Sequence, residues 1–280
     1  MRDIVSFQPM ARPQRVETTE GRGPVRPPLK WAGGKRWQVP YLRPYWELNQ
    51  HRRLVEPFCG GLAVTLGLMP ESALLNDINP HLINFYNWVK KGLIINLAMK
   101  KSEARYYTYR KQFNHLLETS QGESIDTASL FYYLNRTGYN GLCRFNSSGQ
   151  FNVPFGRYKT INYRTDFLEF KSVFANWQFT NADFDRIPLL SDDFVYADPP
   201  YDVEFTAYSK GGFSWEEQER TARFLAKHAG PVILSNQATK RIKDLYSDLG
   251  YKLTELKGPR RISCTGDRSP APEILATRNL

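Results

Sequence analysis

The chain has 280 residues, of which 41% are hydrophobic, so it can bury a sizeable core and is not a disordered composition. Its formal net charge of +10 favours a polyanionic partner, with nucleic acid as the first candidate, although a charge kept for solubility would look the same. No apolar run approaches the roughly 20 residues of a membrane-spanning helix, and the start lacks the apolar stretch of a signal peptide. We therefore expect a cytoplasmic protein with no membrane partner.

The cysteines and histidines are too scattered to suggest a metal site. Cys59, Cys143 and Cys264 are odd in number and far apart, so they form neither a disulfide framework nor a zinc pattern. No two of the four histidines have the spacing of metal ligands. We expect a reduced interior and no metal.

The first half of the chain alternates between predicted strands and helices. Residues 1–26 are polar and carry five arginines, and we expect them to form a basic, disordered tail. Apolar runs predict strands at 54–58 and 73–77, each followed by a helix, at 62–69 and 80–90. This β-α-β-α order predicts a parallel, doubly wound sheet.

The alternation stops near residue 100. Two helices are predicted next, at 103–118 and 127–134, and residues 144–153 suggest a β-hairpin around a Ser-Ser-Gly turn. The sheet pattern then resumes, which predicts an α/β domain of residues 27–99 and 179–280, interrupted by an insertion of residues 100–178. The later elements are strands at 177–179, 194–197 and 231–236, helices at 214–228 and 239–249, and a closing pair of strands at 251–256 and 273–277.

Asp198-Pro199-Pro200-Tyr201 stands directly behind the apolar strand 194–197. The prolines must end that strand because they cannot donate to a sheet ladder, so the acid lies at a carboxyl end, where open α/β sheets bind ligands. The Asp198 carboxylate and the Pro199 carbonyl could accept the two hydrogens of one amino group while Tyr201 stacks on a ring. This arrangement suits a flipped nucleobase with an exocyclic amine. An ordinary turn at the end of a strand is the alternative.

Two further loops lie at predicted strand ends. The turn Glu56-Pro57-Phe58-Cys59-Gly60-Gly61 has glycines that let a ligand approach the backbone closely. Asp77 follows about twenty residues later and could accept hydrogen bonds from ribose hydroxyls. A glycine turn followed by an acid is typical of a nucleoside-cofactor site, although a packing turn would show the same pattern. Upstream, the loop 28–35 could pack its tryptophan on an adenine ring.

The insertion carries the clearest indication that the protein binds a polymer. Residues 135–165 contain five basic residues and no acid, with aromatic residues interleaved. Cations meet phosphates, and arginine or asparagine can read bases, so the insertion is predicted to contact DNA. Phe145, Phe151 and Phe155 are instead expected to form its small core. Arg260-Arg261 is a second candidate for phosphate contacts, with exposed surface charge as the alternative.

Together these motifs resemble the Dam-type, alpha-class DNA adenine methyltransferases. The order is Lys30-Trp31-Ala32-Gly33-Gly34-Lys35, then Glu56-Pro57-Phe58, then the recognition stretch, then Asp198-Pro199-Pro200-Tyr201; the most specific part is residues 133–158. The resemblance covers about residues 27–280. It implies a Rossmann-like methyltransferase sheet with helices on both faces, and an inserted, mainly helical target-recognition domain with a β-hairpin.

The resemblance also implies the chemistry. The donor would be S-adenosylmethionine, released as S-adenosylhomocysteine, and the acceptor the amino group of adenine in double-stranded DNA, within GATC. Such an enzyme would be cytoplasmic, associated with the nucleoid and monomeric, with no obligate protein partner. The resemblance does not distinguish a solitary enzyme from a member of a restriction-modification system.

The resemblance assigns site residues by motif. Leu62 departs from the family pattern, which usually has a glycine there. The catalytic group would be Asp198, Pro199, Pro200 and Tyr201. The cofactor would contact Trp31, Lys35, Glu56, Phe58, Gly60, Asp77, Asp183 and Asp198. DNA would contact Lys30, Arg136, Tyr139, Asn140, Leu142, Arg144, Pro154, Arg157 and Tyr158.

Two other interpretations remain open from the sequence. Transfer to the 4-amino group of cytosine presents the same amine geometry. A catalytically silent, sequence-specific DNA-binding module would keep the basic insertion but has no need of Asp198-Pro199-Pro200-Tyr201.

Overall fold

The structure, a computed structural model of the chain, describes residues 25–202, 213–259 and 271–280. Within these ranges the strands form one sheet of order β3-β2-β1-β4-β5-β7-β6. Strands β1 to β5 pair in parallel, and β7 lies antiparallel between β5 and β6. The strands are β1 (Leu54–Glu56), β2 (Ala73–Asn76), β3 (Trp177–Thr180), β4 (Phe194–Ala197), β5 (Val232–Gln237), β6 (Lys252–Gly258) and β7 (Ala271–Arg278).

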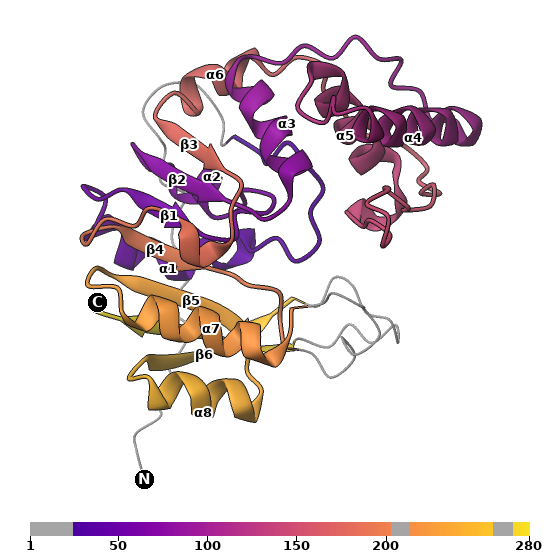
Figure 1. Cartoon of the computed structure of the whole chain (residues 1–280). Helices are drawn as coiled ribbons and strands as arrows, with labels where there is room; N and C mark the ends of the chain where they lie inside the picture. The colour runs from indigo at the N-terminus through magenta and orange to yellow at the C-terminus, as the bar shows by residue number, and fades with distance from the viewer. Residues whose placement is uncertain (1–24, 203–212, 260–270) are drawn as a thin grey trace.

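Helices cover both faces of this sheet, as predicted (Figure 1). Side chains alternate along a strand, so Leu54 packs in the apolar cluster under α1 and α3, whereas Val55 packs in the cluster under α7 and α8. The helices are α1 (Val39–Glu47), α2 (Thr65–Leu68), α3 (Pro80–Lys90), α4 (Glu103–Glu118), α5 (Ile125–Thr137), α6 (Leu168–Val173), α7 (Trp215–Ala226) and α8 (Lys240–Asp248), with single 3₁₀ turns η1 (Arg36–Gln38), η2 (Tyr139–Gly141) and η3 (Phe184–Arg186).

The central strands are buried from end to end. Every residue of β1, β2 and β4 is buried, which is expected where helices cover both faces of a parallel sheet. This explains why the sequence shows short continuous apolar runs and no polar–apolar alternation there. The carboxyl ends of these strands therefore meet at one edge, which is where the polar loops lie.

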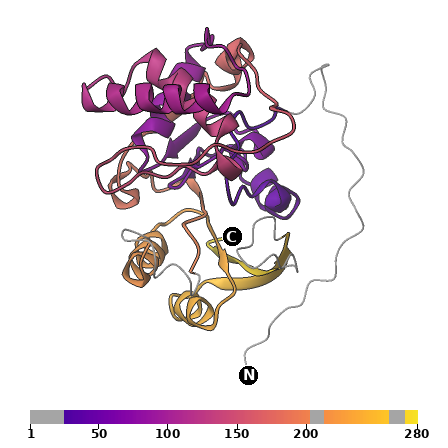
Figure 2. The same cartoon turned by 90° about the vertical axis from the view of Figure 1, so that its right-hand side faces the viewer.

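The inserted helices pack on the sheet through α3. Phe85 of α3 stacks on Tyr132 of α5 with ring centroids 5.6 Å apart, and Phe113 of α4 meets Phe151 of the hairpin at 5.9 Å. These rings belong to the same apolar cluster as Leu54 of the sheet. Figure 1 shows α4 and α5 beside α3, at the β3 end of the sheet, and Figure 2 shows them on the opposite side of the molecule from α7 and α8. The insertion is thus held by a shared core.

The predicted hairpin is present but smaller than regular strands. Phe145 and Phe151 form a single antiparallel bridge, flanked by hydrogen bonds from Asn146 N to Gln150 O at 2.9 Å and from Asn152 N to Arg144 O at 3.1 Å. Phe151 is buried, and Phe145 and Phe155 pack against the same apolar cluster from partly exposed positions, so the three rings join the core shared with the sheet and do not form a separate small core.

Two helices were missing from the sequence prediction. Helix α1 contains Pro40 in its first turn and Pro44 in its interior, and prolines argue against a helix. A first-turn proline is tolerated because its missing N–H would be unpaired anyway. Helix α6 is only six residues long. The segment before it returns to the sheet domain, where Ile95 N donates to Thr165 O at 2.7 Å.

Some predictions concern residues outside the described ranges. Nearly all of the basic tail, Arg260-Arg261 and Cys264 fall there. None of the described helices is both long and apolar enough to cross a membrane.

Candidate active site

Asp198 follows the last residue of β4 and meets Lys35 and Tyr201 at the carboxyl edge of the sheet. The distance from Lys35 Nζ to Asp198 Oδ1 is 3.4 Å, and the ammonium lies 4.2 Å from the centroid of the Tyr201 ring. Lys35 Nζ also donates to Gly33 O at 2.9 Å. Asp198 Oδ1 is shielded from solvent and accepts no hydrogen bond from the described residues. The site therefore offers a carboxylate oxygen ready to accept a hydrogen from a ligand.

Burial at this edge of the sheet raises the pKa of two carboxyl groups above the usual range. Burial raises the pKa of Asp198 to about 6, with the Lys35 charge opposing the shift and the Glu273 charge adding to it. At neutral pH Asp198 is therefore still mostly ionised. Burial raises the pKa of Glu56 further, to about 8, although a hydrogen bond from Thr65 Oγ1 opposes the shift. Glu56 is thus mostly protonated at neutral pH, which avoids a second buried charge beside Asp198.

Trp31 packs directly on the glycine turn. A Cβ at Gly60 would lie 2.7 Å from Trp31 Nε1, and a Cβ at Gly61 would lie 2.6 Å from Trp31 Cβ, so only glycine fits at either position. Leu62 itself adopts the left-handed conformation, with φ of +58°. A positive φ of this kind ordinarily favours glycine, so the backbone at Leu62 is strained. Trp31 and Gly60, both predicted to bind the cofactor, lie together.

Asp77 ties the end of β2 to the same turn. Its Oδ2 accepts from Gly60 N at 3.1 Å and its Oδ1 from Asn79 N at 3.0 Å. Burial raises the pKa of Asp77, and these two backbone donors oppose the shift. Each oxygen retains acceptor capacity, so the carboxylate fits the predicted role of binding hydroxyls.

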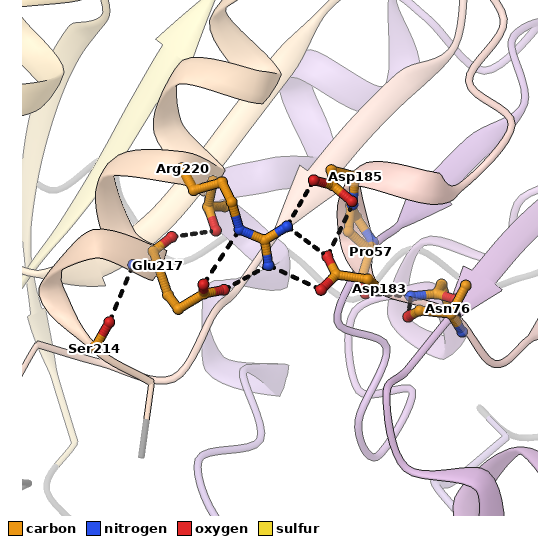
Figure 3. A network of polar contacts seen from close by, with 9 residues as sticks. Pro57, Asn76, Asp183, Asp185, Ser214, Glu217 and Arg220 are labelled. Atoms are coloured by element: carbon orange, nitrogen blue, oxygen red, sulfur yellow. Dashed lines mark hydrogen bonds and ion pairs between the residues drawn. The ribbon is translucent and has the colours of Figure 1, made fainter. Parts of the chain in front are cut away.

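Asp183 is gripped by an arginine that sequence reasoning did not single out (Figure 3). Arg220 of α7 donates from Nη1 to Asp183 Oδ1 at 2.9 Å and from Nη2 to Asp183 Oδ2 at 2.8 Å. The hydrogen bond from Arg220 holds the pKa of Asp183 below its usual value. Arg220 also donates to Asp185 and Glu217, each at 2.6 Å, and lies 4.0 Å from the Phe184 ring centroid.

The helix start near Arg220 was partly predictable. Ser214 caps α7 by accepting from Glu217 N at 3.4 Å, which is one half of a capping box, but the Glu217 carboxylate pairs with Arg220 three residues along the helix (Figure 3). The i,i+3 spacing of the pair was the available signal. Phe58 packs next to this group, because its ring centroid lies 5.3 Å from that of Phe184.

Five of the residues predicted to contact DNA are open to solvent. Arg144 is steadied by a hydrogen bond from its Nε to Asn152 Oδ1 at 2.8 Å. Tyr139 N donates to Pro154 O at 2.9 Å, which places these two residues side by side. The exposed residues are Tyr139, Asn140, Arg144, Pro154 and Arg157, and Leu142 is partly exposed.

Lys30, Arg136 and Tyr158 are instead engaged with the protein. Lys30 Nζ lies 3.6 Å from the Tyr158 ring centroid and donates to Arg136 O at 3.2 Å. Arg136 Nε donates to Asn162 O at 2.7 Å. Burial lowers the pKa of both Lys30 and Arg136. Lys30 N and O also pair with the Asn135 side chain at 2.9 and 2.7 Å, so the loop carrying Lys35 is fastened to the insertion.

No cluster of His, Cys, Asp and Glu that could hold a metal ion is found among the residues that the structure describes. The two cysteines within the described ranges, Cys59 and Cys143, are unpaired thiols.

The sheet order, with an antiparallel β7 between β5 and β6, and the polar loops at its carboxyl edge define a Rossmann-like methyltransferase. The family model of the D12 class N6 adenine-specific DNA methyltransferases matches residues 31–262. The chain belongs to this family, and it is an adenine-specific DNA methyltransferase.

Several curated relatives match this chain along nearly their whole length. The chain is 35% identical to the Retron Ec67 DNA adenine methylase of Escherichia coli, over 89% of this chain and 90% of the relative. It is 36% identical to a DNA adenine methylase of Vibrio cholerae, over 89% and 94%. It is 31% identical to the Type II methyltransferase M1.LlaDCHI of Lactococcus lactis, over 90% and 95%. Cytosine methylation and a silent binding module are therefore set aside.

Proposed function

We propose that this enzyme transfers a methyl group from S-adenosylmethionine to the exocyclic amino group of an adenine flipped out of double-stranded DNA, within GATC, and releases S-adenosylhomocysteine. The observation that carries the proposal is the shielded Asp198 Oδ1, which accepts no hydrogen bond from the described residues and shares with the Tyr201 ring the neighbouring Lys35 ammonium. Its close polar neighbour is the Lys35 ammonium at 3.4 Å, which is longer than a good charged hydrogen bond, so the oxygen keeps acceptor capacity for a ligand donor. GATC is proposed from the resemblance of residues 133–158 to the recognition stretch of GATC-specific enzymes.

The donor fits the residues along the carboxyl edge. S-adenosylmethionine, when bound, supplies an electrophilic methyl group on a positively charged sulfur. Asp77 keeps acceptor capacity for ribose hydroxyls, and the glycine turn brings backbone close to Trp31. The other proposed contacts are Lys35, Glu56, Phe58, Asp183 and Asp198. Asp183 and Asp198, which are ionised at neutral pH, suit a cationic ligand, whereas Glu56 would meet it mostly as a neutral acid.

The residues at the end of β4 would prepare the amine. The adenine nitrogen is a poor nucleophile because its lone pair is delocalised into the ring. Asp198 and the Pro199 carbonyl would accept its two hydrogens, which favours a more tetrahedral nitrogen with its lone pair directed at the methyl group. Tyr201 would stack on the flipped ring. Positioning supplies much of the rate, and the proton leaves after the bond to carbon has formed.

Lys35 has a second role in this scheme. Its ammonium is 3.4 Å from Asp198 Oδ1 and 4.2 Å from the Tyr201 centroid, so it occupies the neighbourhood that the adenine amine must enter. We propose that the arriving base displaces it. Until then the ammonium partly offsets the cost of a buried carboxylate.

DNA would lie across the exposed part of the insertion. Arg144 and Arg157 would meet phosphates or guanine edges, and Tyr139 and Asn140 would enter the space left by the flipped base. Leu142 and Pro154 would contact thymine methyl groups. Lys30, Arg136 and Tyr158 could reach base edges only after releasing the contacts they now make. We assign residues 27–99 and 179–280 to catalysis and 100–178 to target recognition, in a monomer that acts in the cytoplasm at the nucleoid.

The test is methyl transfer from labelled S-adenosylmethionine to two duplexes that differ only in one GATC site. N6-methyladenine on the GATC duplex alone supports donor, acceptor and site together. Label on both duplexes would refute the GATC assignment, and label on neither would refute the proposed donor and substrate pair.

A further inference from the structure

The Tyr201 hydroxyl is anchored by a buried carboxylate from the far end of the chain. Tyr201 OH donates to Glu273 Oε2 at 2.6 Å and lies 3.0 Å from Ser235 Oγ. Glu273 is on β7 and Ser235 on the adjacent antiparallel strand β5, where their register places both side chains on the same face of the sheet. The ring proposed to stack on adenine is therefore tied at its far end to the rigid centre of the fold.

Gln38 completes the anchor from the loop that carries Lys35. Its Nε2 donates to Glu273 Oε2 and to Ser235 Oγ, both at 2.9 Å, and its Oε1 accepts from Tyr196 OH at 2.8 Å. Gln38 is fully buried. Each member of this network has a partner, so the network is a rigid one.

Glu273 is enclosed so that its carboxylate has one position. The residue is 8% exposed, and a Cβ on Gly258 of β6 would lie 2.5 Å from Glu273 Oε1. Burial and the nearby carboxylates raise the pKa of Tyr201 far above its usual value, so the phenol stays protonated and acts as the donor.

Other contacts hold the backbone beside Tyr201 but leave the ring free to turn. The Pro200 carbonyl accepts from Gln218 Nε2 at 2.7 Å, and Asp202 N donates to Asn236 Oδ1 at 3.3 Å. Neither bond constrains rotation of the aromatic ring. The hydroxyl contacts with Glu273 and Ser235 do constrain it, because they fix the position of the ring's outer end.

We infer that Glu273 is a positioning residue for methyl transfer, fixing the Tyr201 ring as a preformed stacking surface for the target adenine. The inference rests on the proposed function, because it takes adenine as the ring that stacks. A preformed surface lowers the entropy cost of ordering the base for attack. Glu273 touches neither substrate nor donor in this account and acts through the Tyr201 hydroxyl.

The test combines Tyr201→Phe, Glu273→Leu and the double variant in the full-length enzyme. If both single variants break the same contact, each lowers kcat by about tenfold and the double variant is no slower than the slower single variant. Glu273→Gln keeps an acceptor oxygen and restores kcat to within about threefold of the wild type. Glu255→Leu, on the exposed surface of neighbouring β6, is the matched control and leaves kcat unchanged.

A second readout separates positioning from folding. With 2-aminopurine at the target position, Tyr201→Phe and Glu273→Leu give the same increase in fluorescence, because the flipped base stacks less well. The dissociation constant of the donor stays unchanged.

Multiplying effects in the double variant, about a hundredfold in kcat, would overturn the inference, as would a Glu273→Gln variant as slow as Glu273→Leu. Should Glu273→Leu fail to fold, kcat still decides, because Glu273→Gln stays within about threefold of the wild type while Tyr201→Phe falls about tenfold. Failure of the wild type on the GATC duplex would instead refute the proposed function.

Discussion

Lys35 Nζ lies 3.4 Å from Asp198 Oδ1, and both groups are enclosed at the carboxyl edge of the sheet. The pair joins the loop before α1 to the end of β4, which are separated in sequence by strands β1 to β3 and the whole insertion. Asp198 keeps a pKa of about 6 despite this positive neighbour, because burial outweighs the attraction. The charge state of Asp198 should therefore control activity within an accessible pH range.

The first prediction concerns the acid limb of activity. The transfer needs Asp198 as a carboxylate, so kcat/KM of the wild type should fall about tenfold per pH unit below pH 6. Lys35→Met removes the attractive charge and should move this limb to higher pH, whatever it does to the maximal rate. Steady-state profiles of kcat/KM between about pH 5 and about pH 9 measure the fall in the wild type and its shift in Lys35→Met.

Lys240→Met is the matched control for that profile. The Lys240 side chain is exposed on α8 and pairs with Asp244. Its profile should superimpose on the wild type. An unmoved limb in Lys35→Met would contradict the electrostatic account.

The second prediction is that Asp198→Asn abolishes transfer yet stabilises the fold. Because the pKa of Asp198 rises from 3.8 to about 6 on folding, the folded state binds the proton more tightly. Its contribution to stability is therefore greatest below about pH 4 and is lost as pH rises through about 6. Asparagine removes this loss, so the free energy of unfolding at pH 7 should increase by about 2–3 kcal/mol.

Urea denaturation at two pH values measures this gain. It should be present at neutral pH and absent below the ordinary pKa of an aspartate. Equal stability of the wild type and Asp198→Asn at neutral pH would argue against a pKa of Asp198 that is raised by burial.

The third prediction separates Arg220 from its neighbour Arg223. Arg220→Met frees Asp183 from a bidentate grip, so the KM for S-adenosylmethionine should rise about tenfold while kcat at saturation changes little. Arg223, on the same helix, makes only a 3.8 Å contact with Glu219 and is the control. If Arg220→Met leaves the KM for the donor unchanged, then the ion pair between Arg220 and Asp183 does not contribute to donor binding.

The fourth prediction divides the arginines of the insertion by their contacts. Arg144→Ala and Arg157→Ala alter exposed side chains, so each should weaken DNA binding and lower the slope of affinity against salt by about 1, without changing the unfolding temperature. Arg136→Ala removes the donors to Asn162 O and should cost about 1–3 kcal/mol of stability. Fluorescence anisotropy over a salt series and thermal unfolding measure the two effects.

The fifth prediction weighs two opposing effects at Leu62. Glycine would relieve the left-handed backbone, worth about 1 kcal/mol, but would remove a fully buried side chain, and burial losses of this kind cost about 3–5 kcal/mol. Burial should prevail, so Leu62→Gly should be less stable by at least about 2 kcal/mol. A more stable variant would show that backbone strain dominates.

Local patterns in the chain were enough for the α/β class and for most of the elements. Continuous apolar runs marked β1, β2 and β4, and prolines at 199 and 200 placed Asp198 at a strand end. Helix α1 was not predicted because Pro40 and Pro44 argue against a helix. Its apolar face is recognised only in the structure, where it packs on the sheet. The site residues were proposed by motif, and their roles stay predictions until the experiments above are done.

The sequence by itself determined the parallel sheet, the acid and aromatic at the end of β4, and the acid-free basic stretch 135–165 of the insertion, because each depends on neighbours within a few positions. Only the tertiary structure decided which charges are paired. Tyr201 and Glu273 are 72 residues apart, and Lys30 and Arg136 are 106 apart. Such contacts depend on the order in which the strands pair and on how the insertion packs on α3. Both are set by the burial of whole apolar faces, and a pattern of a few neighbouring residues does not contain that information.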